Sequence, residues 1–221
     1  MGVKLHGNIV NEWYETKKNV DEMVHWEKPK LKKWELAVTE FFPAEAKILD
    51  VGCGLGREAF VLSDMGYKVT GIDISQEVID QVVPFSVQKG YDIPFSVYDG
   101  HKLPFEADSF DVVIIWAQTF GLLYGNEYKH EFLLECKRVL TNGGLLSYSA
   151  HDYRFLMENY KNVMKGRKFY PYADTELYWE TFEPDELMAF AKDAGYTLIL
   201  CEKGEIYIPE DGTILHCLCR K

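Results

Sequence analysis

The sequence lacks the features of a membrane or secreted protein. No uninterrupted apolar run approaches the about 18 residues that a membrane-spanning helix needs. The first residues contain no apolar segment typical of a signal peptide. The five cysteines are scattered, and no CxxC or HExxH spacing indicates a structural zinc site. These absences predict a cytoplasmic protein with reduced thiols, no bound metal and no membrane partner.

Positive charge is also scarce. Lysine and arginine number 24 against 35 aspartates and glutamates, which gives a net charge of -11. Such an acidic surface repels phosphate backbones, so nucleic acid is not expected as a partner. The lysines between residues 28 and 33 are flanked by glutamates, and this run is interpreted as a solvated helix face. A small-molecule partner is expected, and the chain is expected to be a monomer or a homodimer.

Short apolar runs alternate with helical patterns from residue 47 onward. The run FDVVIIW, Phe110 to Trp116, is almost continuously apolar, which is typical of a parallel strand buried on both faces. Strands are predicted over 47–51, 67–72, 94–98, 110–116 and 145–150, and helices over 57–65, 76–89 and 127–140. A kink or break is expected at Pro84, and Asn142-Gly143-Gly144 is expected to cap the third helix. The alternation predicts a doubly wound, Rossmann-like α/β sheet with helices on both faces.

The end of the chain departs from this alternation. Residues 196–207 and 213–220 are both strand-like, and the segment between them is too short for a parallel crossover. We therefore expect an antiparallel C-terminal hairpin and a seven-stranded, mostly parallel sheet. The 221 residues are expected to form a single domain. Its parts are a helical cap over 1–43 that is broken near Pro29, a core over 44–150, an insertion over 151–182, and a last helix with the hairpin over 183–221.

A glycine-rich turn follows the first strand in AKILDVGCGLGREAF, Ala46 to Phe60. The dinucleotide fingerprint is G-x-G-x-x-G, but here the third glycine comes one residue early and Arg57 stands in its place. No Lys-Ser/Thr pair follows, which excludes a P-loop. Asp50 precedes the glycines, and a carboxylate there opposes a pyrophosphate and suits a cation.

The segment ILDVGCGLGREA resembles the first motif of class I S-adenosylmethionine-dependent methyltransferases, D/E-x-G-x-G-x-G. The resemblance continues through VTGIDIS, YDGHKLPF and ECKRVLTNGGLLSYS. It implies that Asp73 binds the ribose hydroxyls, that Ile74 packs on the adenine, and that Asp99 and the Gly100 N–H bind the adenine edge. The alternatives left open are a capping aspartate for Asp73 and a turn aspartate for Asp99.

The cofactor implied by this resemblance is S-adenosyl-L-methionine. Glycines let the backbone approach a ligand closely, the following helix N-terminus suits a carboxylate, and Asp50 suits an ammonium group. Tyr14 is expected to close over the methionine end, although simple packing explains it equally well. The complete set of expected cofactor contacts is Asp50, Gly52, Cys53, Gly54, Gly56, Asp73, Ile74, Asp99, Gly100, Trp116 and Tyr14.

The acceptor pocket is expected outside the C-terminal ends of the strands. Residues 152–182 are rich in aromatic residues, which suggests a lid that favours a cationic or planar acceptor. The alternative is that most of these rings only bury an added helix. The residues chosen to line the pocket are Gln118, Tyr172, Tyr178 and Trp179. His151 ends the fifth strand, where it can act as a general base or hold a loop by hydrogen bonding.

These observations predict methyl transfer by in-line displacement to a nitrogen, oxygen or sulfur nucleophile of a small molecule. The prolines of DNA amino-methyltransferases are missing after the fourth strand, where the sequence reads Trp116-Ala-Gln118-Thr119. Three alternatives remain: a non-catalytic S-adenosylmethionine-binding or scaffold protein, an aminopropyl transferase, and a nicotinamide-dependent oxidoreductase.

Overall fold

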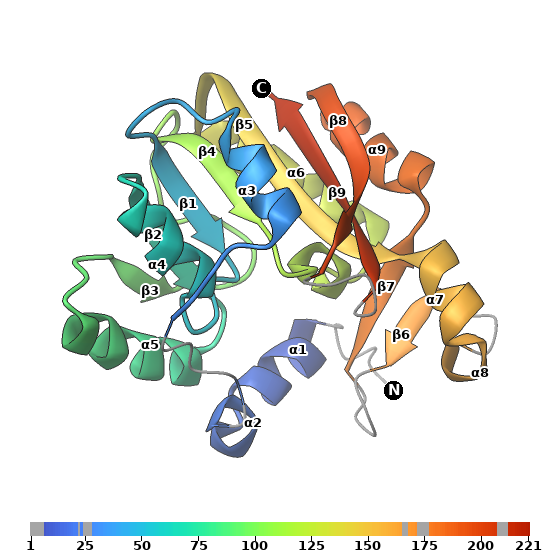
Figure 1. Cartoon of the computed structure of the whole chain (residues 1–221), viewed down its shortest axis with the longest axis horizontal. Coiled ribbons are helices and arrows are strands. Elements are labelled where there is room, and N and C mark those ends of the chain that lie inside the picture. The colour runs from blue at the N-terminus through green and yellow to red at the C-terminus, as the bar shows by residue number, and fades with distance from the viewer. Residues whose placement is uncertain (1–6, 22, 24–27, 165–167, 172–176, 207–211) are drawn as a thin grey trace.

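The computed structural model describes residues 7–21, 23, 28–164, 168–171, 177–206 and 212–221. A twisted central sheet runs through the molecule with helices packed around it (Figure 1). The described helices include none that is long and apolar enough to cross a membrane.

Five parallel strands form the core of the sheet in the order β3-β2-β1-β4-β5. Their bounds are β1 Lys47–Val51, β2 Lys68–Asp73, β3 Phe95–Val97, β4 Phe110–Ile115 and β5 Leu140–Asp152. Strand β9, Thr213–Arg220, runs antiparallel to β5 and pairs with β8, Thr197–Glu205. The mostly parallel sheet with an antiparallel C-terminal hairpin is therefore confirmed, as the short connection between the last two strands required.

Among the described residues the sheet has nine strands rather than the expected seven. The two additional strands are β6, Phe169–Pro171, and β7, Tyr178–Phe182. Strand β7 pairs with only the last two residues of β5, through His151↔Thr181 and Asp152↔Phe182. They lie within the segment interpreted as a lid, and they extend the sheet beyond the C-terminal end of β5.

Helices cover both faces of the sheet, as predicted. On one face α6, Asn126–Val139, and α9, Pro184–Asp193, pack with Val113 and Ile115 of β4. On the other face α3, Lys33–Thr39, and α4, Arg57–Asp64, pack with Val112 and Ile114. Successive β4 side chains enter opposite cores because side chains alternate along a strand, which accounts for the continuous apolar run.

The remaining helices differ in detail from the prediction. They are α1 Gly7–Tyr14, α2 Lys17–Asp21, α5 Gln76–Lys89, α7 Tyr153–Asn159, α8 Lys161–Met164 and the 3-10 turn η1 Thr119–Leu122. Helix α5 continues through Pro84 without a break. Helix α6 ends because Leu140 is extended, so Asn142-Gly143-Gly144 lies inside β5 and is not a helix cap.

A buried ion-pair network connects α3 to the glycine-rich turn. The Arg57 guanidinium donates to both oxygens of Glu35, at 2.8 and 2.7 Å, and Glu35 is completely buried. Arg57 also contacts Glu58 and donates to the Lys30 carbonyl oxygen at 3.0 Å. Burial opposes the charge on Glu35, but the Arg57 hydrogen bonds prevail and keep the pKa of Glu35 below its usual range.

Removal of Glu35 should therefore destabilise the protein strongly. We expect Glu35→Ala to lower the free energy of unfolding by about 3–5 kcal/mol, because it leaves a buried guanidinium without its bidentate partner. The matched control is Glu205→Ala, which removes an exposed pair with Lys33 at 3.1 Å and should cost no more than about 1 kcal/mol. Urea denaturation measures both. Equal effects of the two substitutions would contradict the prediction.

Candidate active site

The glycine-rich turn has a backbone that only glycine adopts without strain. Gly52, Gly54 and Gly56 have φ of 72°, 50° and 83°. A Cβ on Gly52 would lie 2.7 Å from Thr119 Cγ2, whereas a Cβ on Gly54 would meet only Met23 Cε, at 3.6 Å. The turn therefore packs tightly at Gly52 and leaves room beside Gly54, which suits close approach of a ligand to the backbone.

Asp73 holds the glycine-rich turn against the end of β2. Its carboxylate accepts the backbone N–H of Gly54 and that of Ser75, both at 3.1 Å. The side chain is buried, and burial raises the pKa of Asp73 even though these hydrogen bonds act to lower it. The predicted ribose-binding residue is therefore fixed beside the turn, and its contact with ribose stays a prediction.

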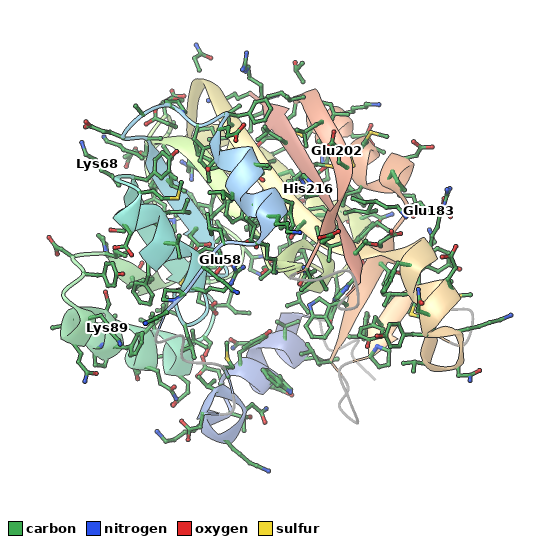
Figure 2. All side chains as sticks on the ribbon, viewed as in Figure 1. Glu58, Lys68, Lys89, Glu183, Glu202 and His216 are labelled. Atoms are coloured by element: carbon green, nitrogen blue, oxygen red, sulfur yellow. The ribbon has the colours of Figure 1, made fainter. Side chains whose placement is uncertain are left out.

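Asp50 is a buried carboxyl at the end of β1 that forms no ion pair with another described residue. It is 2% exposed, and Oδ2 has no hydrogen-bond partner among the described residues. Burial, and next the negative charge of Glu58, raise the pKa of Asp50 well above its usual range, while Arg57 acts in the opposite sense. Figure 2 shows Glu58 toward the interior, whereas Lys68 and Lys89 lie at the edge of the molecule. An unpartnered carboxyl oxygen beside a glycine-rich turn is a suitable partner for a cationic group.

Ile74 and Gly100, predicted to contact an adenine, lie together at the ends of β2 and β3. A Cβ on Gly100 would be 3.4 Å from Ile74 Cγ2. Asp99 is exposed, and its Oδ1 accepts the backbone N–H groups of His101 and Lys102 at 2.8 and 2.9 Å. These hydrogen bonds lower the pKa of Asp99. Asp99 is therefore a turn residue, which is the role that was left open as the alternative to an adenine contact.

The N-terminal helices α1 and α2 lie beside the glycine-rich turn. The Tyr14 carbonyl oxygen accepts from Ser75 Oγ at 2.8 Å, and Glu15 Oε1 accepts from the Gln76 N–H at 2.6 Å. The half-buried Tyr14 side chain packs in a cluster that includes Ile74. Tyr14 therefore lies beside Ile74, its closure over the methionine end of the cofactor stays a prediction, and the anchoring hydrogen bonds were not predicted.

Two expected cofactor side chains have other partners in the structure. Cys53 is buried with Phe60 and Val82 between α4 and α5. Trp116 is 1% exposed, and its indole N–H donates to Ser147 Oγ at 2.7 Å while the ring packs edge-on against Trp34. Side-chain alternation along β4 places Trp116 on the same face as Ile114. Any cofactor contact at these two positions would have to come from the backbone.

The chain leaves β4 through a strained turn that the sequence did not indicate. Ala117 and Gln118 both have left-handed backbones, with φ of 51° and 62°. This region is uncommon for residues other than glycine, and such strain concentrates at functional sites. The Gln118 N–H donates to Ser149 Oγ at 3.1 Å, and the buried Gln118 Nε2 has no partner among the described residues.

His151 lies beside two aromatic rings at the end of β5. Its ring centroid is 5.5 Å from those of Trp179 and Tyr170. Burial, and next the positive charge of Lys32, lower the pKa of His151 to about 4. Lys32 is 6% exposed, so its interpretation as part of a solvated face was wrong. A neutral imidazole at this place can accept a proton.

The predicted aromatic residues do not all reach this histidine. Trp179 does, whereas Tyr178 stacks on Tyr124 with ring centroids 4.4 Å apart. Tyr172 lies outside the described residues. Tyr170 belongs to the same aromatic-rich segment and was not chosen, because composition alone does not distinguish which rings face His151. Lys32 was missed because its burial depends on tertiary contacts.

A groove of about 690 Å³ lies elsewhere, between α6, β7 and α9. Its wall includes Glu180, which pairs with the buried Lys129, and Glu186, which pairs with Lys168. Glu180 and Trp179 are neighbours on β7 and so face opposite sides of it. Within the described part of the chain, no group of three or more His, Cys, Asp or Glu residues is arranged to hold a metal ion.

Comparisons with known proteins agree with this geometry. A family model described as "Methyltransferase domain" matches residues 48–144. Bacillus subtilis YqeM, which is named as a methyltransferase, is 28% identical over 74% of this chain and 65% of its own length. A ubiquinone biosynthesis O-methyltransferase of Coxiella burnetii is 28% identical over 69% of this chain and 64% of its own length. The chain thus spans slightly less than two thirds of these relatives.

A solved structure shares the fold over most of the chain. The S-adenosylmethionine-dependent methyltransferase structure from Methanosarcina mazei has a TM-score of 0.76 and 21% identity, covering 86% of this chain and 99% of that one. The matched segment, 48–144, begins in β1 and contains the glycine-rich turn, Asp73 and the Ala117–Gln118 turn. In sequence motif, fold and matched segment this chain is similar to class I S-adenosylmethionine-dependent methyltransferases.

Proposed function

We propose that this protein transfers a methyl group from S-adenosylmethionine to a small-molecule acceptor. The observation that carries the proposal is the arrangement at the ends of β1 and β2. The turn of three left-handed glycines is tied to Asp73 by the Gly54 N–H at 3.1 Å, beside a buried Asp50 oxygen that lacks a partner among the described residues. This arrangement offers a close backbone approach and negative charge to a ligand that carries a sulfonium and an ammonium group.

Each part of the proposed cofactor site has a distinct role. Asp73 binds the ribose hydroxyls, and Ile74 and Gly100 hold the adenine. Asp50 binds the ammonium group, and the N-terminus of α4, which follows Gly56 directly, presents N–H groups to the carboxylate. When bound, the sulfonium supplies a methyl carbon that a nucleophile attacks in line with the departing sulfur.

The acceptor is proposed to bind on the His151 side of this site. His151 takes a proton when the nucleophile arrives protonated, and the rings of Trp179 and Tyr170 exclude water from around it. The structural scaffold alone does not specify the acceptor. The relative named as an O-methyltransferase favours an oxygen nucleophile among the nitrogen, oxygen and sulfur alternatives.

Cofactor binding should release a proton from Asp50. Its raised pKa favours the neutral form before binding, and a bound ammonium favours the ionised form. Affinity should therefore increase with pH, by up to about tenfold per pH unit between the pKa values of the bound and free states. Titrations in two buffers of different ionisation enthalpy should give release of up to about one proton. Asp50→Asn should abolish this release, and Asp64→Asn should not; release unchanged in Asp50→Asn would contradict the assignment.

The proposal is tested by calorimetric titration of the full chain with S-adenosylmethionine, S-adenosylhomocysteine and NAD. Micromolar binding of the first two, without NAD binding, is the expected result. Radiolabelled methyl transfer to small phenols, amines and thiols then tests the activity. Binding without any transfer supports a non-catalytic binding protein. Binding of NAD alone would overturn the proposal in favour of an oxidoreductase.

A further inference from the structure

Two cysteines lie opposite each other in the C-terminal hairpin. Cys201 of β8 is paired with Cys217 of β9 in the antiparallel register. Opposite residues point to the same face of a sheet. The next pair along the hairpin, Glu202↔His216, points to the other face, where His216 stacks on Trp34. The two thiols therefore face the side of the sheet on which α9 packs (Figure 1).

The spacing of this cross-strand pair suits a disulfide bond. Directly opposite residues of antiparallel strands have Cα atoms about 4.5–5.5 Å apart, and disulfides join Cα atoms that are about 4.4–6.8 Å apart. Both cysteines are free thiols in the structure. A bond between Cys201 and Cys217 therefore needs rotation of two side chains and no change in the strand register.

The two thiols differ in exposure and in acidity. Cys201 is half-buried, whereas Cys217 is buried. A hydrogen bond with the Cys217 thiol lowers the pKa of Cys201, although burial and the charges of Asp185 and Glu202 act to raise it. Burial, and next the hydrogen bond with Cys201, raises the pKa of Cys217. A partly accessible thiol of lowered pKa beside a second thiol is typical of cysteines that react reversibly with oxidants.

The other three cysteines do not share these properties. Cys219 is buried opposite Leu198, and burial raises the pKa of its thiol to about 12. Cys53 follows β1 and Cys136 belongs to α6, and both are buried. Burial raises the pKa of each of these two thiols. Buried thiols of raised pKa are unreactive, so the expected reactivity is specific to the cross-strand pair.

We propose that Cys201 and Cys217 form a site of reversible oxidation, at which a hydroperoxide converts the two opposite thiols into a disulfide. This site is independent of the proposed methyl transfer. Chains with reduced thiols at rest form such bonds transiently when an oxidant is present. Cys201 is the thiol that reacts with the peroxide, and Cys217 is the thiol that closes the disulfide.

The oxidation takes place in two balanced steps. The Cys201 thiol loses its proton and its sulfur attacks one peroxide oxygen, so that a sulfur–oxygen bond forms as the oxygen–oxygen bond breaks. With hydrogen peroxide the products are a sulfenic acid and water. The Cys217 sulfur then attacks the sulfenic sulfur, the sulfur–oxygen bond breaks, and the leaving hydroxide takes the Cys217 proton as a second water. Both sulfurs are oxidised, both peroxide oxygens are reduced, and a dithiol reverses the reaction.

The test treats the reduced, folded full chain with hydrogen peroxide, blocks the remaining thiols and maps the peptides by mass spectrometry. The expected result is a linked pair of peptides that contain Cys201 and Cys217, with the other three cysteines still reduced. Dithiothreitol should restore both thiols. Before oxidation, iodoacetamide should label Cys201 at least about tenfold faster than any other cysteine of the native protein, because its thiol is the more accessible and the more acidic.

Three variants assign the roles of the two thiols. Cys201→Ser should leave Cys217 reduced under the same treatment. Cys217→Ala should leave Cys201 as a sulfenic acid, which dimedone traps, and further peroxide should oxidise it irreversibly. The matched control is Cys219→Ser, which changes the neighbouring cysteine of β9 and should still form the linked pair.

The wild-type peptide map decides the proposal even if a variant does not fold. Oxidation that leaves Cys201 and Cys217 reduced, a disulfide between two chains, or a wild-type Cys201 that ends as a sulfinic acid would overturn it. Sulfenic acid at Cys217 rather than at Cys201 would overturn the assigned order of the two steps. None of these results bears on cofactor binding or methyl transfer, so the proposed function stands or fails separately.

Discussion

Replacement of Asp73 by alanine should weaken S-adenosylmethionine binding at least about 100-fold. The substitution removes the acceptor for the Gly54 and Ser75 N–H groups, both at 3.1 Å. Hydrogen bonds to charged groups contribute about 1.5–3 kcal/mol each, and about 2.7 kcal/mol corresponds to 100-fold in affinity. Loss of the proposed ribose contact adds to this effect. Calorimetric titration measures the dissociation constant directly.

Two further variants separate local from general effects of the Asp73 substitution. Asp73→Asn keeps one oxygen acceptor, so its affinity should lie between those of the wild type and the alanine variant. Asp80→Ala removes an exposed carboxylate on α5 that accepts from the Gln76 side chain at 2.8 Å. It should bind the cofactor as the wild type does. An affinity of Asp73→Ala within threefold of wild type would contradict both the ribose contact and the contribution of the Asp73-held turn to cofactor binding.

Replacement of His151 by glutamine should lower kcat by about 10²–10⁴-fold, the usual contribution of a general base. The dissociation constant for S-adenosylmethionine should stay within about twofold, because His151 lies outside the proposed cofactor contacts. The pH dependence gives an independent signature. With a pKa of about 4, His151 is neutral above that pH, so wild-type kcat/KM should be flat between about pH 6 and 8 with respect to this group and should fall only toward pH 4.

The control for the His151 variant is another histidine in a polar contact. His130→Gln changes a residue of α6 whose Nε2 lies 3.3 Å from the Asp193 carbonyl oxygen, and it should leave kcat near the wild-type value. If His151→Gln retains kcat within about fivefold, proton transfer to this residue is excluded. The alternative, a histidine that positions the end of β5, would then stand.

Features that cost stability gather on one side of the sheet. Asp50 Oδ2, Gln118 Nε2 and His216 Nδ1 are buried polar atoms without partners among the described residues. His216 stacks on Trp34 at 4.6 Å and lies toward the interior (Figure 2). With the left-handed Ala117–Gln118 turn, they occur on or near the face that carries Ser149 and His151. Retained strain and unsatisfied polar groups are expected where binding supplies the missing partners.

Local patterns in the sequence determined most of the scaffold. The apolar run FDVVIIW predicted a strand buried on both faces, and β4 indeed contributes to both cores. The short connection before Thr213 required the antiparallel hairpin. The spacing of Gly52, Gly54 and Gly56 indicated a glycine-rich turn after the first strand, and in the structure all three have positive φ. These features are set by side-chain periodicity, chain reach and backbone sterics, which act between residues close in sequence.

Tertiary contacts determined which residues lie on the proposed acceptor side of the sheet. Pairing of β7 with the end of β5 placed Trp179 rather than Tyr178 beside His151. Lys32 is buried and forms an ion pair with Glu35, although its place in a run of charged residues had indicated exposure to solvent. The left-handed turn at Gln118 depends on packing between β4, Ser149 and the following 3-10 turn. Side-chain burial and strand register depend on contacts between segments that are distant in sequence. The local sequence pattern therefore does not predict them.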